Sequence, residues 1–260
     1  MSIGDVLKIA FFVLLILALA LAIMNYIQQA SQPPQPVLAM NWPAGITYKG
    51  PDTTALAGYY CIENMNSNNG YSIQLNAELD NGVWVQDVYI VAPDGQSGLN
   101  VNVWRGSSSV SARFVPANAP CAWLVITIKG GYAYVGYSLD GENIIWYASY
   151  SVGATYIVPD TRTNLVTAGY AYGIQAQLNN GTLVYLALYY WNGTAWVPAP
   201  VGINQGLGGT QETVNHAWEF TSGSCGGYVA WFGWNKTNPE SPVLPSNLEP
   251  ICPTSPGFRL

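Results

Sequence analysis

The stretch YSIQLNAELDNGVWVQDVYIV, residues 71–91, decides the fold class of this chain. Apolar and polar residues alternate through its first nine positions. The apolar set is Tyr71, Ile73, Leu75, Ala77 and Leu79, and the polar set is Ser72, Gln74, Asn76 and Glu78. A period of two residues predicts a β-strand with one buried face. Asn81-Gly82 supplies the positive φ angles of a tight turn, so residues 83–91 are predicted to return as the second strand of a hairpin.

The same pattern recurs along the chain. Turn signals lie at residues 129–131, 140–141, 179–181 and 192–193. They separate predicted strands, rich in Val, Ile, Tyr and Trp, at residues 124–128, 132–139, 144–150 and 183–191. No segment after residue 40 shows a sustained helical period, so we expect antiparallel hairpins stacked as one or two β-sandwiches.

The N-terminus is different, because residues 9–24 (IAFFVLLILALALAIM) form an uninterrupted apolar run. With its flanks the run reaches the ~20 residues that a bilayer requires. We predict one long hydrophobic α-helix over residues 1–30, a membrane anchor or filament core. A cleaved signal peptide is less favoured, because the preceding MSIGDVLK has no positive excess. Pro33, Pro34 and Pro36 predict a hinge over residues 31–42, before an extracellular β-sandwich region over 43–260.

The predicted fold class is therefore mostly β: one or more antiparallel β-sandwich domains preceded by a long N-terminal hydrophobic α-helix. Only 8% of residues are charged, and the net charge is -6 with no Lys/Arg cluster, which argues against a nucleic-acid partner. His216 is the only histidine, so a metal site or a histidine-based proton relay would rest on one residue. We expect no metal and no cofactor.

Cysteines and sequons indicate an oxidising exterior. The four cysteines lack the C-x-x-C spacing of metal or redox sites, so two structural disulfides are predicted, with all three pairings open. They are Cys61, Cys121, Cys225 and Cys252. Glycosylation sequons begin at Asn180, Asn192 and Asn235. These features predict a location at the extracellular face of the cell, with glycans as covalent modifications.

Several collinear motifs are similar to those of the thermopsin family of archaeal acid proteases. They are PAGI at 43–46, SIQLN at 72–76, WVQDV at 84–88, NVW at 102–104, VGY at 135–137, LALYY at 186–190 and GTQET at 209–213. The WVQDV block is the most specific and the GTQET block is next. The resemblance implies an extracellular, acid-tolerant β fold and an endopeptidase that works at low pH.

Acid proteolysis requires carboxyl groups, because histidine would be permanently protonated. The candidates that the resemblance offers are Asp87 with Gln86, and Glu212 with Gln211. Alternation places Asp87 and Gln86 on opposite faces of one strand, so one of them points inward. The inward group could equally be a hydrogen-bonded structural residue. Glu212 could be a solvated loop carboxylate or a cap.

Two departures weaken the enzyme hypothesis. Residues 146–149 (WYAS) contain no carboxyl where the family tends to carry an aromatic-Asp pair, and residues 167–173 (TAGYAYG) replace a glycine-rich run. The sequence therefore favours a non-enzymatic subunit of an archaeal cell-surface filament, pilus type and type IV pilin-like, or of another surface assembly. Copies would polymerise through the helix, with the membrane as a partner at least during biogenesis.

Two alternatives remain. The first is a membrane-tethered, thermopsin-like acid endopeptidase using Asp87 and Glu212. The second is an adhesin or sugar-binding surface domain, which predicts exposed Tyr and Trp residues in a row on one face.

Overall fold

The computed structural model describes residues 19, 37–39, 43–64, 67, 69–111, 114–159, 162–171, 173–203, 212–215, 217–222, 225–232 and 250–260, with the backbone alone at 37–39, 110–111 and 222. The chain divides into two compact units, Met1–Gln35 and Pro36–Leu260. All the elements described below belong to the second unit.

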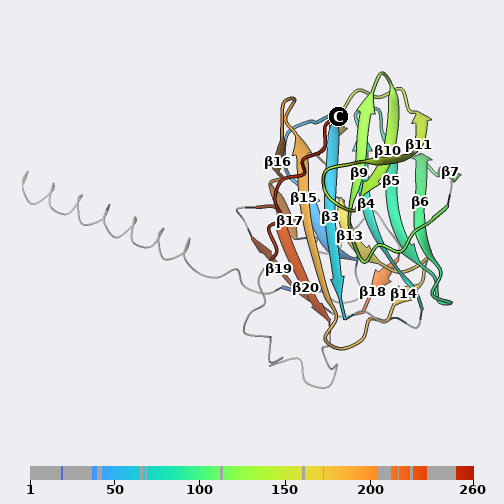
Figure 1. Ribbon diagram of the computed structural model, residues 1–260, viewed down its shortest axis with the longest axis vertical. Helices are drawn as coiled ribbons and strands as arrows, with labels where there is room; N and C mark the ends of the chain where they lie inside the picture. Colours follow the sequence, from blue (N-terminus) through green and yellow to red (C-terminus); the bar gives the residue numbers. More distant parts are fainter. Residues whose placement is uncertain are drawn as a thin grey trace, which may run out of the picture. The chain divides into compact units, whose positions relative to one another are not determined.

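Two large sheets form this unit (Figure 1). Sheet A contains, in spatial order, Val37–Ala39 (β1), Ala217–Ser222 (β19), Gly227–Phe232 (β20), Leu183–Trp191 (β15), Ala55–Glu63 (β3), Cys121–Lys129 (β9), Tyr132–Ser138 (β10) and Ile145–Ser151 (β11), with Trp196–Pro198 (β16) also beside β15. Sheet B contains Val201–Ile203 (β17), Ala44–Tyr48 (β2), Leu165–Ala168 (β13), Tyr71–Leu79 (β4), Val83–Val91 (β5), Ser97–Arg105 (β6) and Ser108–Ser111 (β7), with Ile157–Val158 (β12) beside β4 and Val115–Pro116 (β8) beside β6.

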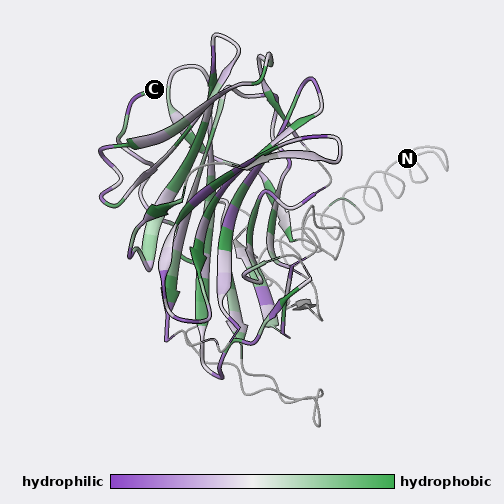
Figure 2. Ribbon diagram, turned by 90° about the vertical axis from the view of Figure 1, so that its right-hand side faces the viewer, coloured by the Kyte–Doolittle hydropathy of each residue, from purple (hydrophilic) through white to green (hydrophobic). Residues whose placement is uncertain are grey.

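Among the described residues, the strand pairings within sheets A and B are all antiparallel, as predicted. A short parallel pair, Gln175–Ala176 (β14) and Thr213–Val214 (β18), stands apart from them. The inner faces of the two sheets share one apolar core, in which Leu75 and Val85 of sheet B and Ile126 and Leu186 of sheet A are all buried. Hydrophobic and hydrophilic segments alternate along several strands in Figure 2, as the period of two requires.

The hairpin predicted from residues 71–91 is confirmed. Strands β4 and β5 have the predicted bounds, and Glu78 lies opposite Trp84 next to the turn. Gly82 has a φ of 77° and donates its N–H to the Leu79 carbonyl over 2.8 Å. A side chain at that φ would be strained, which explains the glycine.

The N-terminal part of the fold-class prediction is corrected. The part of the chain that the structure describes is built from strands and contains no helical element, so it does not include the predicted long helix before the sandwich. Apart from Leu19, residues 1–30 lie outside the described residues. In the described ranges, no helix has both the length and the hydrophobicity needed to span a bilayer.

Two disulfides are present, as predicted, and the structure selects their pairing. Cys61–Cys121 joins the neighbouring strands β3 and β9, where the two residues are direct register partners. Cys225–Cys252 ties the turn before β20 to the C-terminal segment, residues 250–260. That segment lies against the outer face of sheet A, where Phe258 belongs to a second apolar cluster with Trp123 and Trp196.

Candidate functional site

The outer face of sheet B carries a cluster of amide side chains. Gln86 on β5 donates from Nε2 to Asn76 Oδ1 over 3.0 Å and to Gln74 Oε1 over 3.3 Å. Its Oε1 accepts the indole N–H of Trp104 on β6 over 2.7 Å. The register explains this convergence, because Asn76 lies opposite Gln86 and Trp104 is two residues from its other partner, Asn102. We call Gln74, Asn76, Gln86 and Trp104 the amide cluster.

The cluster continues towards its neighbours along β4. Gln74 donates to the Ser72 hydroxyl over 3.0 Å, and that hydroxyl donates to the Gly169 carbonyl over 2.8 Å. Asn76 donates to the Thr163 carbonyl over 3.1 Å. The strand over residues 71–79 was predicted to be half-buried, but Gln74, Asn76 and Gln86 on the polar face are also buried. Burial is tolerated because their amide groups are hydrogen-bonded, which holds them in fixed positions.

A charged pair lies at one end of the amide cluster. Glu78 forms an ion pair with Arg162, and the guanidinium lies 4.0 Å from the ring centroid of Trp84. Glu78 is opposite Trp84, so it is the diagonal neighbour of Gln86 on the same face. Such neighbours are roughly 7–8 Å apart. The Arg162 and Glu78 side chains are 37% and 27% exposed, so this end of the face is accessible to solvent.

Asp87 points the other way, into the core between the sheets, and has no exposed surface. It accepts the Tyr147 hydroxyl over 2.5 Å and the Val125 backbone N–H over 3.2 Å, both from sheet A. Burial raises the pKa of Asp87 well above its usual value, and the hydrogen bonds from Tyr147 and Val125 oppose that shift. The structure therefore separates Asp87 from Gln86, as alternation predicted, and identifies Asp87 as the inward group.

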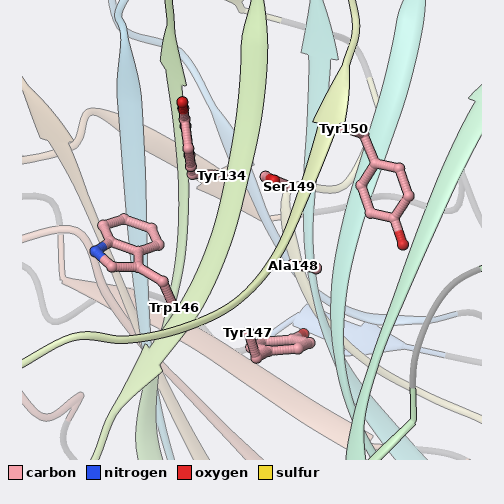
Figure 3. A pocket seen from close by; sticks show the side chains of 6 residues that line it. All are labelled: Tyr134, Trp146, Tyr147, Ala148, Ser149 and Tyr150. Carbon is pink, nitrogen blue, oxygen red and sulfur yellow. The ribbon is translucent and has the colours of Figure 1, made fainter.

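A β-bulge positions the Tyr147 side chain next to Asp87. Gly136 is the register partner of Trp146 and Val135 that of Ala148, so Tyr147 is an extra residue without a partner on β10. A bulge re-aims a side chain, and here the Tyr147 ring turns inward while Trp146 stays outside (Figure 3). The segment in which the sequence lacks the family's carboxyl thus supplies the hydroxyl that holds Asp87.

A second buried carboxyl, Glu219, was missed by the sequence analysis. It accepts the Gly45 N–H of sheet B over 3.1 Å and the Tyr228 hydroxyl over 2.7 Å. Burial raises its pKa to about 8, against the effect of the hydrogen bonds from Tyr228 and Gly45. Its Oε2 has no hydrogen-bond partner among the described residues. The available signal was an acidic residue inside the apolar strand AWEFTS.

The remaining residues singled out from the sequence lie outside the amide cluster or outside the described residues. Glu212 is half-buried and directly precedes β18. A Cβ added to Gly169 would lie 3.3 Å from the Thr213 carbonyl oxygen, so the Glu212 segment approaches the Gly169 end of the hydrogen-bond chain. Gln211, His216 and Asn235 lie outside the described residues. Asn180 and Asn192 lie in exposed turns, and their glycosylation stays a prediction.

The described residues offer no group of three or more His, Cys, Asp or Glu side chains that could hold a metal ion. The chemistry available on the outer face of sheet B is that of amides, one carboxylate and one guanidinium. Such a set can polarise a carbonyl, accept a proton and bind an extended polar chain.

No family model matches this chain, and neither does any curated protein. Solved structures with a similar fold include scytalido-glutamic peptidase with a transition-state analogue inhibitor (11% identity, TM-score 0.47) and SCP-B, a member of the eqolisin family of peptidases, with the tripeptide Ala-Ile-His (11% identity, TM-score 0.43). Each of these two alignments covers 75% of this chain and 100% of the other.

A functionally unknown protein from Saccharomyces cerevisiae is similar over 62% of this chain and 95% of its own (13% identity, TM-score 0.31). Two of these similar structures are peptidases, which agrees loosely with the protease resemblance of the sequence. At these TM-scores the likeness carries no argument about activity.

Proposed function

We propose that this chain is an acid endopeptidase that cleaves peptides on the outer face of sheet B, with the Gln86 amide and the Glu78 carboxylate as its reacting groups. One observation carries the proposal. Three blocks of the thermopsin resemblance, SIQLN, WVQDV and NVW, fold onto the adjacent strands β4, β5 and β6. Their polar side chains join in the amide cluster instead of being scattered over the surface.

The chemistry follows from the positions of the two groups. Gln86 Nε2 polarises the scissile carbonyl and stabilises the oxyanion, exchanging its longer bond to Gln74, 3.3 Å, for one to the substrate. Glu78 accepts the proton of the attacking water and then returns it to the leaving nitrogen as the C–N bond breaks, giving an acid and an amine. Arg162 forms an ion pair with the Glu78 carboxylate and holds it at this end of the amide cluster.

The two carboxyls that the resemblance offers take different places in this proposal. Asp87 is sealed between the sheets and serves the fold. Glu212 approaches the far end of the same hydrogen-bond chain, so it is the competing candidate for the carboxylate and is tested beside Glu78.

An acid proteolysis assay on a denatured protein substrate, at about pH 2 to 6, tests the proposal. Gln86→Ala and Glu78→Gln are each expected to lower kcat/KM by about 100-fold or more, because each removes a group that acts in the transition state. Glu212→Gln and the exposed control Glu63→Gln are expected to stay within about threefold of the wild type.

Two results would contradict this assignment. A folded wild-type protein without proteolysis anywhere in that range would exclude the endopeptidase. Loss of activity in Glu212→Gln but not in Glu78→Gln would transfer the carboxylate role to Glu212.

The two disulfides favour an oxidising, extracellular location, which we propose for this enzyme. The filament hypothesis depended on residues 1–30, which lie outside the described residues apart from Leu19. No described contact supports it.

A further inference from the structure

A row of aromatic rings lies on the outer face of sheet A, at its β10–β11 end. The ring centroids of Tyr132 and Tyr134 are 6.4 Å apart, and those of Tyr134 and Trp146 are 6.3 Å apart. Tyr132 and Trp146 are 46% and 43% exposed. In Figure 3 the rings of Tyr134 and Trp146 lie on one side of the strands, away from those of Tyr147 and Tyr150.

Tyr134 and Trp146 of this row line a groove of about 580 Å³. Trp191 at the end of β15 lines the groove with Trp146, and Leu260 also borders it. The groove is lined by Thr54, Thr127, Ile128, Lys129, Tyr134, Trp146, Trp191 and Leu260. The side chains of this lining combine aromatic rings with hydroxyl groups and one ammonium, and they include no Asp or Glu.

In the neighbouring part of the same face, the aromatic residues are buried by packing. There the C-terminal segment covers the sheet, and Phe258 packs edge-on against Trp123 and Trp196 at centroid distances of 6.2 and 5.3 Å. The Trp196 indole N–H donates to the Phe258 carbonyl over 3.0 Å. Outside this covered part of the face, the rings of Tyr132 and Trp146 stay exposed. Packing therefore accounts for Trp123 and Trp196 but not for Trp146.

The side chains that line the groove also indicate the chemical class of its ligand. A pyranose ring has an apolar C–H face that stacks on an indole or phenol ring, and a rim of hydroxyls that exchange hydrogen bonds with threonine and lysine. Nucleobases also stack on aromatic rings, but a chain with net charge -6 and a single ammonium in this groove lacks the positive charge that phosphates need. We propose that the groove between Trp146 and Trp191 binds an oligosaccharide.

This site lies on sheet A, on the opposite outer surface of the sandwich from the amide cluster, and it does not depend on the proposed proteolysis. Native gel electrophoresis tests the site, with one of four soluble polysaccharides in the gel: β-glucan, α-mannan, galactan or chitosan. Titration calorimetry then measures the affinity for the hexasaccharide of the polysaccharide that retards the protein. Trp146→Ala and Trp191→Ala are each expected to weaken binding by about tenfold.

Two controls keep this test decisive. Ile145→Ala removes an exposed apolar side chain from the same strand but outside the groove, and is expected to bind as the wild type does. Trp146→Phe keeps an aromatic face and is expected to restore most of the affinity, even if Trp146→Ala folds poorly. The proposal is overturned if none of the four polysaccharides retards the folded protein, or if retardation survives in the Trp146→Ala/Trp191→Ala double variant.

Discussion

Asp87 and Glu219 are buried carboxyls with the same kinds of hydrogen-bond partners. Each is a fully buried carboxyl that accepts one backbone N–H from the opposite sheet and one tyrosine hydroxyl, from Tyr147 and Tyr228 respectively. A buried charge without a counter-charge is costly, so the neutral acid is the favoured form of both groups. These two carboxyls therefore link the sheets as neutral hydrogen-bonding groups.

Removing the Asp87 carboxyl tests this role. Asp87→Ala is expected to lower the free energy of unfolding at pH 4 by about 3 kcal/mol, because it removes the acceptor of the buried Val125 N–H and leaves the Tyr147 hydroxyl only the Asn100 carbonyl, at 3.4 Å. Asp87→Asn keeps one acceptor oxygen and should lose about half as much. Urea denaturation measures both, with the exposed Asp52→Ala as the control. If Asp87→Ala matches that control, the carboxyl does not hold the sheets together.

The C-terminal segment acts as an added layer on sheet A, although it forms no strand. Its Phe258 side chain is only 3% exposed, and the Cys225–Cys252 disulfide anchors the segment beside β20. The Tyr189 hydroxyl also donates to the Pro253 carbonyl. Each of these contacts joins the segment to a strand or turn far away in the sequence, so residues 250–260 cover the part of the outer face of sheet A around Trp123, Tyr189 and Trp196.

Phe258→Ala tests whether this cover stabilises the fold. We expect it to cost roughly 3 kcal/mol, since a buried phenyl ring and its packing against Trp123 and Trp196 are lost. Tryptophan fluorescence should shift to longer wavelength in the native state as these indoles meet water. Leu260→Ala, in the same segment but 38% exposed, is the matched control. Equal stability of the two variants would show that the segment is only loosely held.

The sandwich as a whole should be more stable in acid than in neutral solution. The pKa values of Asp87 and Glu219 are raised in the folded state, so the folded protein binds protons that the unfolded chain releases. The stability that such groups contribute is fully present when the pH is below their pKa in the unfolded chain. It is lost as the pH rises through their pKa in the folded protein. For Glu219 this window runs from 4.5 to about 8. This dependence would suit an enzyme that works in acid.

Thermal unfolding between about pH 4 and 9 measures this effect. The melting temperature of the wild type should fall steadily as the pH rises through the Glu219 window, and Glu219→Gln should flatten the upper part of the curve. The exposed Glu63→Gln serves as the control. A melting temperature that rises over the same range would show that carboxylates stabilised by their charge, not these buried acids, set the pH response.

Local sequence patterns were sufficient to predict several of the strands and the turns between them. The alternation in residues 71–91 and the Asn81-Gly82 turn predicted the β4–β5 hairpin with its observed bounds, because side-chain direction in a strand depends only on whether a position is odd or even. The same rule predicted that Gln86 and Asp87 face opposite ways. The number of disulfides also followed from the sequence alone.

Contacts between distant segments were decided only by the tertiary structure. No local pattern tells which segment will cover a face, so the burial of the amide cluster, the disulfide pairing and the Phe258 cover could not be predicted. The bulge that turns Tyr147 towards Asp87 depends on how β10 and β11 pair, and the Glu219 contact with Gly45 spans 174 residues. The period of two gives each strand two faces, but it is the packing of the sheets that assigns one of them to the core.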